Sequence, residues 1–193
     1  MSEGDTAGPE ANSVAEARAE AQARRGALRA ERQARIAEAF PGEPPGRAIA
    51  HASWAATVAL GVVSVLALLD ADRFLTIYFV VTFTLFALGA LLLAVDVVLA
   101  AVRSTTHSMG IGGLFFLADA APRPVQLSLN ASLAVSLLVS VSAAVIGLST
   151  PELAFGTLVP TLQLSLSGLW GVRHGLFPER NHEADGHRGS ASR

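Results

Sequence analysis

The near absence of charge across the central part of this chain constrains its fold more than any other feature. Between residues 49 and 172 we count only five acids and three arginines. A soluble domain needs charged and polar side chains to cover its surface. Here those residues are concentrated at the two ends of the chain, which predicts a membrane-embedded middle with aqueous tails.

Four apolar runs divide this middle, and each is long enough to cross a bilayer as a helix. A helix rises about 1.5 Å per residue, so about 20 residues cover a hydrocarbon core of about 30 Å. Backbone groups in lipid must bond within their own segment, which favours helices. The predicted spans are residues 49–69, 74–96, 125–148 and 153–172, which form a four-helix transmembrane domain at 49–172.

Two very short connections join these spans in pairs. Residues 70–73 link spans one and two, and residues 149–152 link spans three and four, so we expect two tight hairpins. Asp72 is a candidate cap for span two, because a carboxylate can accept from free backbone N–H groups at a helix start. The predicted fold class is an all-α membrane protein with four transmembrane helices, preceded by an N-terminal cytoplasmic helix.

The N-terminal region divides into three segments by composition. Residues 1–12 are small and polar, and we expect a disordered tail. Residues 13–40 are rich in Ala, Arg and Glu and predict a charged helix, supported by pairs such as Glu31 with Arg35. Residues 41–48 form a linker rich in Pro and Gly. The helix is interpreted as solvated, with a membrane-surface helix and a docking helix for a partner as alternatives.

The distribution of arginine predicts the orientation. Seven arginines precede span one, two lie between spans two and three, and four follow span four, whereas only Arg73 lies on the other side. The positive-inside rule therefore places both termini in the cytoplasm, including a disordered tail at 173–193. All 14 basic residues are Arg, and the chain is rich in Ala and Gly, which favours a bacterial source and the plasma membrane.

Span three carries the most regular polar pattern. Serines recur there at every fourth position, and four residues turn a helix by about 400°, so they share one face. Small residues let helices approach closely in lipid, which favours a helix-packing face. A polar lining for a solute pathway is the alternative. The serines are Ser128, Ser132, Ser136 and Ser140.

Span four contains a proline and a glutamine near its middle. Pro160 cannot donate a hydrogen bond to the carbonyl of Gly156, so we expect a kink there. Gln163 lies close to the expected midplane, where an unpaired amide is costly, and we therefore expect it to face the bundle. Packing is the favoured interpretation, and a gate or binding site is the alternative.

A further polar group lies near the predicted inner ends of the spans. Intramembrane ionisable residues are candidates for function, although water and lipid headgroups solvate residues at the membrane edge. A metal site, a proton relay and a lipid-headgroup site are the functional alternatives to ordinary helix ends. No charged residue lies at the predicted centre of the bilayer, which argues against a proton-driven pump. The inner-edge residues are His51, Asp96, Asn130, Arg173 and His174.

Other classes of function lack the residues they need. There is no Cys for a thiolate site, no metal-ligand spacing such as His-Glu-x-x-His and no phosphate-binding glycine loop, so we expect no metal, no cofactor and no catalytic residues. A net charge of −2 and the absence of a basic domain argue against nucleic acid. The stretch 153–160, with Gly168 to Gly175 and Phe177-Pro178, resembles the last span of uncharacterised small multi-span membrane proteins of actinobacteria.

These patterns favour a non-enzymatic integral membrane protein, serving as an accessory or scaffold subunit of the bacterial plasma membrane. The alternative is a small transporter or channel, with a polar pathway along the serine face and the region of Pro160 and Gln163. The expected partners are membrane lipid, other membrane or cytoplasmic proteins, or further copies of the chain.

Overall fold

The described part of the chain is built from helices. A computed structural model describes residues 9–105 and 110–177, apart from the side chains of residues 9–13 and 111, and every regular element in this part is a helix. Four of its segments are long and apolar enough to cross a membrane, which confirms the prediction of four membrane-length helices. Most of the two predicted disordered tails, residues 1–8 and 178–193, lies outside the described residues.

The chain divides into two compact units, Met1–Pro41 and Gly42–Arg193. The first contains α1 (Pro9–Ala39), which begins earlier than the predicted start at residue 13. Among its described side chains Ile36 is buried and nearly all others are exposed. The Arg35 guanidinium donates to the Glu31 carboxylate over 2.6 Å, as the i,i+4 spacing predicts.

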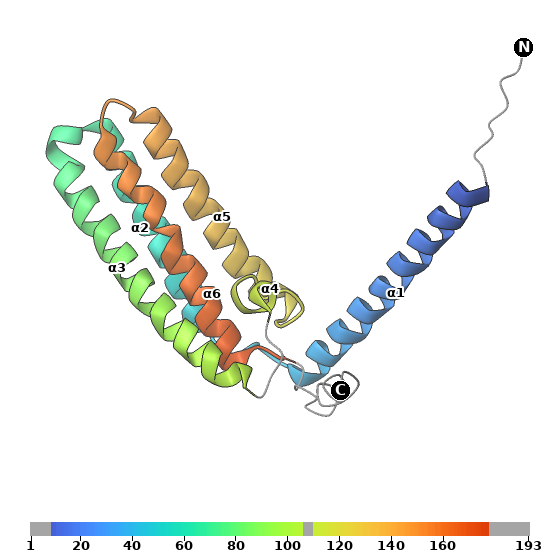
Figure 1. Cartoon of the computed structure of the whole chain (residues 1–193). Helices are drawn as coiled ribbons and strands as arrows, with labels where there is room; N and C mark the ends of the chain where they lie inside the picture. The colour runs from blue at the N-terminus through green and yellow to red at the C-terminus, as the bar shows by residue number, and fades with distance from the viewer. Residues whose placement is uncertain (1–8, 106–109, 178–193) are drawn as a thin grey trace, which may run out of the picture. The chain divides into compact units, whose positions relative to one another are not determined.

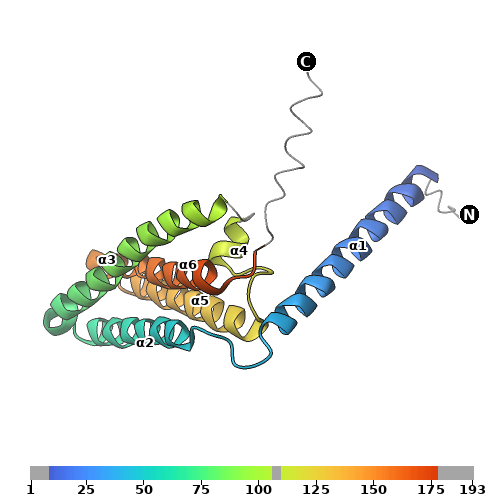
Figure 2. The same ribbon diagram turned by 90° about the horizontal axis from the view of Figure 1, so that it is seen from below.

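The second unit is a bundle of long helices lying side by side (Figures 1 and 2). In it α3 packs against α6 and α2 packs against α5, and α6 also contacts α2 and α5. The short helix α4 packs against α6. The elements are α2 (Arg47–Leu69), α3 (Ala71–Ser104), α4 (Ile111–Phe115), α5 (Arg123–Ile146), the 3₁₀ helix η1 (Pro151–Leu158) and α6 (Pro160–His174).

The start of α3 differs from the prediction that Asp72 caps it. Asp70 is the N-cap residue, and its carboxylate accepts from the Arg73 backbone N–H over 3.2 Å. Asp72 instead lies inside the first turn, where its negative charge favours the positive end of the helix dipole. Because α2 ends at Leu69 and α3 begins at Ala71, Asp70 is both the C-cap residue of α2 and the N-cap residue of α3.

The fourth span changes its helical form at Pro160. The segment before this proline is the 3₁₀ helix η1, and α6 begins at Pro160 itself. Proline lacks an N–H group and fixes φ near −65°, which suits the first position of an α-helix. Where a kink was predicted, the structure has a change between two helix types at Pro160.

The interior of the bundle is rich in polar and small residues, while large apolar residues cover much of its surface. One apolar cluster joins Tyr78 and Leu153 with Val63 and Ala67. Many leucines, valines and phenylalanines of α3 are exposed instead. This distribution suits lipid, where an exposed apolar side chain carries no cost and small interior residues allow close packing.

Candidate functional site

The serine face of α5 points into the bundle and toward α2. Ser132, Ser136 and Ser140 are fully buried, and Ser128 at the end of the series is half-buried. The hydroxyl oxygens of Ser132 and Ser53 on α2 lie 2.5 Å apart. One turn away, the indole N–H of Trp54 donates to the Ser128 hydroxyl over 3.1 Å. The predicted stripe thus lies where α2 and α5 meet.

Gln163 joins the fourth span to this contact. Its side chain is fully buried, and its amide donates to the Thr57 hydroxyl over 3.2 Å. The Thr57 hydroxyl in turn lies 3.0 Å from the Ser53 carbonyl and 3.3 Å from the Ser132 carbonyl. Ser53, Thr57, Ser132 and Gln163 therefore form one hydrogen-bonded group from three helices, called here the polar core.

A separate hydrogen bond joins α6 to α3. The Ser165 hydroxyl donates to the Gly89 carbonyl over 2.8 Å, and it also lies 2.7 Å from the Thr161 carbonyl. Gly89 is required for this approach, since an added Cβ would lie 2.6 Å from the Leu162 nitrogen. The α3–α6 contact is therefore a close backbone approach made possible by a residue without a side chain.

Two buried oxygen atoms in this region could accept a hydrogen bond that no described residue donates. The Ser136 hydroxyl and the Gln163 carbonyl oxygen are buried and have no hydrogen-bond partner among the described residues. Buried polar atoms normally have a partner, which can be an ordered water or a ligand. Ser136 and Gln163 can therefore each accept a further hydrogen bond. Neither they nor the polar core include a nucleophile paired with a base, which covalent catalysis would need.

The predicted inner-edge residues lie in different surroundings. His51 is exposed, and Arg173 is exposed at the end of α6. The Asn130 amide donates to the Phe116 carbonyl over 3.2 Å and so holds the turn after α4. The His174 ring lies 5.6 Å from the Trp170 ring. Among the described residues, no hydrogen bond or ring contact joins these four side chains to one another.

Asp96, the fifth member of the predicted inner-edge group, differs from the rest. Its side chain is fully buried in the bundle, and neither carboxylate oxygen has a hydrogen-bond partner in the part of the chain that the structure describes. An unpaired buried carboxyl within a membrane helix is unusual and expensive, which makes Asp96 a candidate for function.

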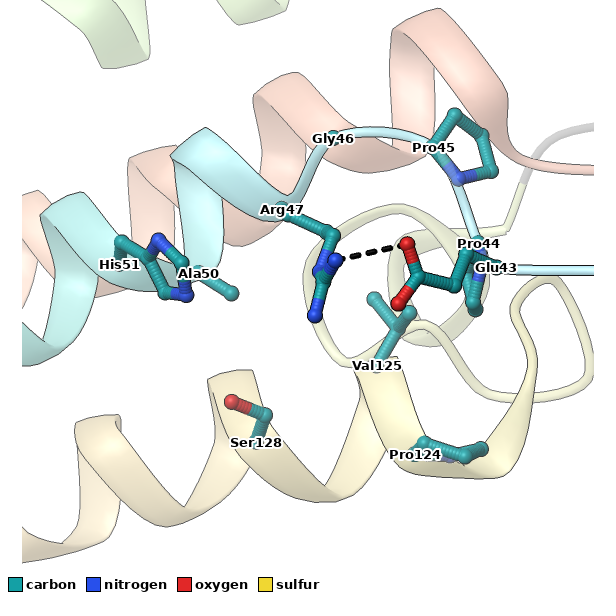
Figure 3. Close-up of a pocket in the computed structure, with 10 residues that line it drawn as sticks. All are labelled: Glu43, Pro44, Pro45, Gly46, Arg47, Ala50, His51, Pro124, Val125 and Ser128. Carbon is teal, nitrogen blue, oxygen red and sulfur yellow. Dashed lines mark hydrogen bonds and ion pairs between the residues drawn. The ribbon is translucent and has the colours of Figure 1, made fainter.

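A hollow of about 280 Å³ lies between the start of α2 and the start of α5. Figure 3 shows Glu43 and Arg47 paired at its rim, with His51 further along α2. The Arg47 guanidinium and the Glu43 carboxylate are 2.6 Å apart. His51 and Ser128 are the two predicted residues that line it.

The end of α6 packs beside this hollow. The Trp170 indole donates to the Pro45 carbonyl over 2.9 Å. Gly46 adopts the left-handed conformation (φ 79°), and a Cβ there would lie 2.7 Å from the Trp170 ring. Glycine at this position thus lets the linker turn against Trp170, which fixes the beginning of α2 to the end of α6.

Several important residues were missed at the sequence level. Ser53 and Thr57 are spaced by four residues in α2, the same signal that identified the serines of span three, and this signal could have found them. Arg103 donates to the carbonyls of Val172 and Gly175 near the end of α6. No sequence pattern pairs residues so far apart in the chain, so this contact could not be found.

Comparisons add no named relative to this picture. No family model matches the chain, and no curated protein or solved structure matches it. Within residues 9–105 and 110–177, no group of three or more His, Asp or Glu side chains could hold a metal ion.

Proposed function

We propose that this protein is a non-enzymatic accessory or scaffold subunit of a bacterial plasma membrane. Its four membrane-length helices are compatible with an integral membrane protein. In this proposal the bundle anchors the chain in lipid, and the charged helix α1 contacts a partner in the cytoplasm. Both termini lie on the cytoplasmic side, as the arginine distribution predicts.

The observation that carries the proposal is that the polar side chains of the bundle bond mainly to one another and to backbone groups. Ser132 bonds to Ser53, Gln163 bonds to Thr57, and Ser165 bonds to the Gly89 carbonyl. A pathway for solutes would instead expose such groups to an opening. Bonds that join three or four helices favour a rigid anchor.

The exposed surface of α1 supports a contact role. This helix has 31 residues and belongs to a unit separate from the bundle. Its described arginines and glutamates are exposed, including the adjacent Arg24 and Arg25 and, about one turn later, Arg29. Charged, solvated helix surfaces favour complementary surfaces, where they steer association and set specificity. We therefore place the partner contact on α1.

Membrane lipid is the second expected partner. Large apolar side chains of α3 such as Phe83, Leu91 and Val98 are exposed and suited to acyl chains. A second copy of the chain or another membrane protein could cover part of this surface. The proposal assigns the specific contact to α1 and the general contact to the bundle surface.

The test is a pull-down of the tagged full-length chain from native membranes in mild detergent, followed by mass spectrometry of the intact complexes. We expect a protein partner at fixed stoichiometry. In a variant with Arg24, Arg25 and Arg29 changed to Gln, the partner should be lost while the bundle remains folded, because only α1 is altered.

The matched control changes residues of the bundle surface instead. Replacing Phe83 and Leu91 by Ala should leave the partner bound, because these side chains face lipid in the proposed arrangement. Recovery of the chain alone, as a monomer or homo-oligomer, would count against an accessory role. Loss of the partner in the control only would move the contact from α1 to the bundle.

A small transporter or channel is the second candidate, and a specific observation favours it. The Ser136 hydroxyl and the Gln163 carbonyl oxygen lie buried without described partners, as groups that contact a polar solute or water would. The test is solute flux into liposomes that contain the pure protein. Flux that a bulky replacement such as Ser136→Leu abolishes would support transport, and inactivity across many solutes would reject it.

A further inference from the structure

Asp96 is a carboxyl group enclosed within the bundle. It lies on α3, its exposed fraction is 0%, and neither of its oxygens has a hydrogen-bond partner among the residues described. Asp72, on the same helix, is exposed. The two residues are chemically identical and differ in their access to water, so they form a natural pair for comparison.

The space around the Asp96 carboxyl is formed by small and apolar groups. A Cβ added to Gly168 on α6 would lie 2.8 Å from the Asp96 Oδ2 atom and 3.0 Å from the Phe115 ring. The carboxyl therefore occupies the space that a side chain at position 168 would fill, with the ring of Phe115 beside it. Three elements, α3, α4 and α6, meet at this point.

The charged and titratable groups on these elements have other described contacts. The Arg103 guanidinium donates to the Val172 and Gly175 carbonyls, and His174 lies against Trp170. Arg173 is exposed, and the five residues of α4 carry no titratable group. On α2, Arg47 pairs with Glu43 and His51 is exposed. Within residues 9–105 and 110–177, none of these groups makes a hydrogen bond to the Asp96 carboxyl.

We infer that Asp96 is a proton-binding site, in which the enclosed carboxyl group carries a proton while the bundle is folded. An ionised carboxylate in such a place would need a cation or several hydrogen-bond donors, and the described residues supply no hydrogen bond to it. A proton neutralises the group and requires no additional space. This inference is independent of the accessory role of α1.

A hollow lies next to Phe115, on the other side of this ring's contact with the site. About 290 Å³ of space lies between α3 and α4, lined by Val97, Ala100, Ala101 and Leu114 among others. Phe115 lines this hollow and also lies beside the Asp96 carboxyl. An apolar reagent that enters this hollow would meet the Phe115 ring beside the carboxyl, whereas a charged reagent would have to leave water for a largely apolar lining.

The test uses dicyclohexylcarbodiimide, an apolar reagent that attacks protonated carboxyl groups. The carboxyl proton moves to a nitrogen of the reagent, and the carboxylate oxygen bonds to its central carbon. The adduct rearranges to a stable N-acylurea without a leaving group, so the protein gains the mass of one reagent molecule. The full-length protein in detergent or vesicles is treated, and the modified peptide is identified by mass spectrometry.

We expect one modification per chain, located at Asp96, and slower labelling as the buffer is made more alkaline. Asp96→Asn should lose this modification and remain folded, because an amide has nearly the same shape. Asp72→Asn is the matched control and should label as the unchanged protein does. The infrared band of a protonated carboxyl group should also be present in the unchanged protein and absent from Asp96→Asn.

Two results would overturn the inference. If a water-soluble, charged carbodiimide modified Asp96 as fast as the apolar one, the carboxyl would be hydrated. If the infrared band were absent from the folded, unchanged protein, the carboxyl would be ionised whatever the labelling. A failure of the pull-down from native membranes would leave both readouts unaffected, so the two proposals fail separately.

Discussion

Two spans of the bundle, α3 and the fourth span, have opposite relations between hydrophobicity and burial. The most apolar 18-residue window of α3 is only 11% buried, although α3 is the most apolar span. In the fourth span, Pro151–His174, which is the least apolar, the corresponding window is 61% buried. In a soluble protein the more apolar helix would be expected inside.

The difference shows which force organises the interior of this bundle. Lipid is as apolar as leucine, so moving a leucine of α3 inward would gain little. Small residues of the fourth span such as Ser165, Gly168 and Gly171 permit close approach and hydrogen bonds, which lipid cannot supply. The centre of the bundle is therefore occupied by the span that packs most closely.

The strongest test of this comparison replaces one leucine by alanine in each of the two spans. Leu162 is 6% exposed and Leu91 is 63% exposed. We expect Leu162→Ala to lower the free energy of unfolding by about 2–5 kcal/mol, because a cavity forms among its neighbours. Leu91→Ala should change it by less than about 0.5 kcal/mol, since lipid replaces the lost methyl groups.

For this pair, the unfolding of both variants in mixed detergent is monitored by circular dichroism. Equal losses of stability in Leu162→Ala and Leu91→Ala would break the comparison, because they would show that exposed leucines of α3 also have packing partners, as in an oligomer.

The next test concerns the close approach of α3 to α6 at Gly89. Gly89→Ala should lower the free energy of unfolding by about 1–3 kcal/mol, because the new methyl group meets the backbone of Leu162. Gly61→Ala on α2 is the control. An added Cβ at position 61 has nothing within 4 Å, so this change should be neutral or slightly stabilising.

These glycine variants sharpen the comparison because they add the same single methyl group to two helices. Thermal unfolding in one detergent, measured side by side, gives the difference directly. If the Gly89→Ala protein were as stable as the Gly61→Ala protein, α3 and α6 could move apart at Gly89 without a loss of stability.

A smaller effect is expected where α3 holds the end of the fourth span. Arg103→Met removes donors to the Val172 and Gly175 carbonyls and the contact of the guanidinium with the Phe177 ring. We expect the free energy of unfolding to fall by about 1–2 kcal/mol and hydrogen exchange to become faster in the last turn of α6.

The control for Arg103 is Arg73→Met at the other end of the same helix. Arg73 is exposed and lies over the Phe74 ring. Its replacement should change stability by less than about 0.5 kcal/mol. Unchanged hydrogen exchange of α6 in Arg103→Met would show that this helix end does not depend on α3.

The smallest effect is expected in the polar core. Gln163→Leu should lower the free energy of unfolding by less than about 1 kcal/mol. The change removes one hydrogen bond to Thr57, but it also removes a buried acceptor that has no described partner, and the two effects oppose each other. A double-mutant cycle with Thr57→Val measures the bond itself, with an expected coupling of about 0.6 kcal/mol. A coupling near zero would remove Gln163 from the polar core.

Much of the fold could be predicted because its signals are local. Runs of about 20 apolar residues predict membrane-length helices without knowledge of their neighbours. The four-residue spacing of the serines predicts that they share a face, and the structure buries three of them completely. The exact ends were less predictable: span two was predicted to end at Asp96, although its apolar run continues to Val102, and α3 continues to Ser104.

The details of the candidate sites could not be predicted in the same way. The hydrogen bond of Gln163 to Thr57 joins residues 106 positions apart, and that of Trp170 to Pro45 joins residues 125 apart. Such contacts depend on the rotation and depth of each helix in the bundle. Both are set by side-chain packing over the whole helix, which a single sequence pattern does not contain.

The sequence by itself determined that this protein is helical and has four helices suited to a membrane, because lipid forces long apolar runs to satisfy their own backbone groups. The tertiary structure decided which span fills the centre and which polar groups meet there. It also decided that Asp96 is enclosed beside Gly168 and Phe115, although its sequence position suggests an ordinary helix end. The physical reason is that enclosure is a property of three packed elements, α3, α4 and α6.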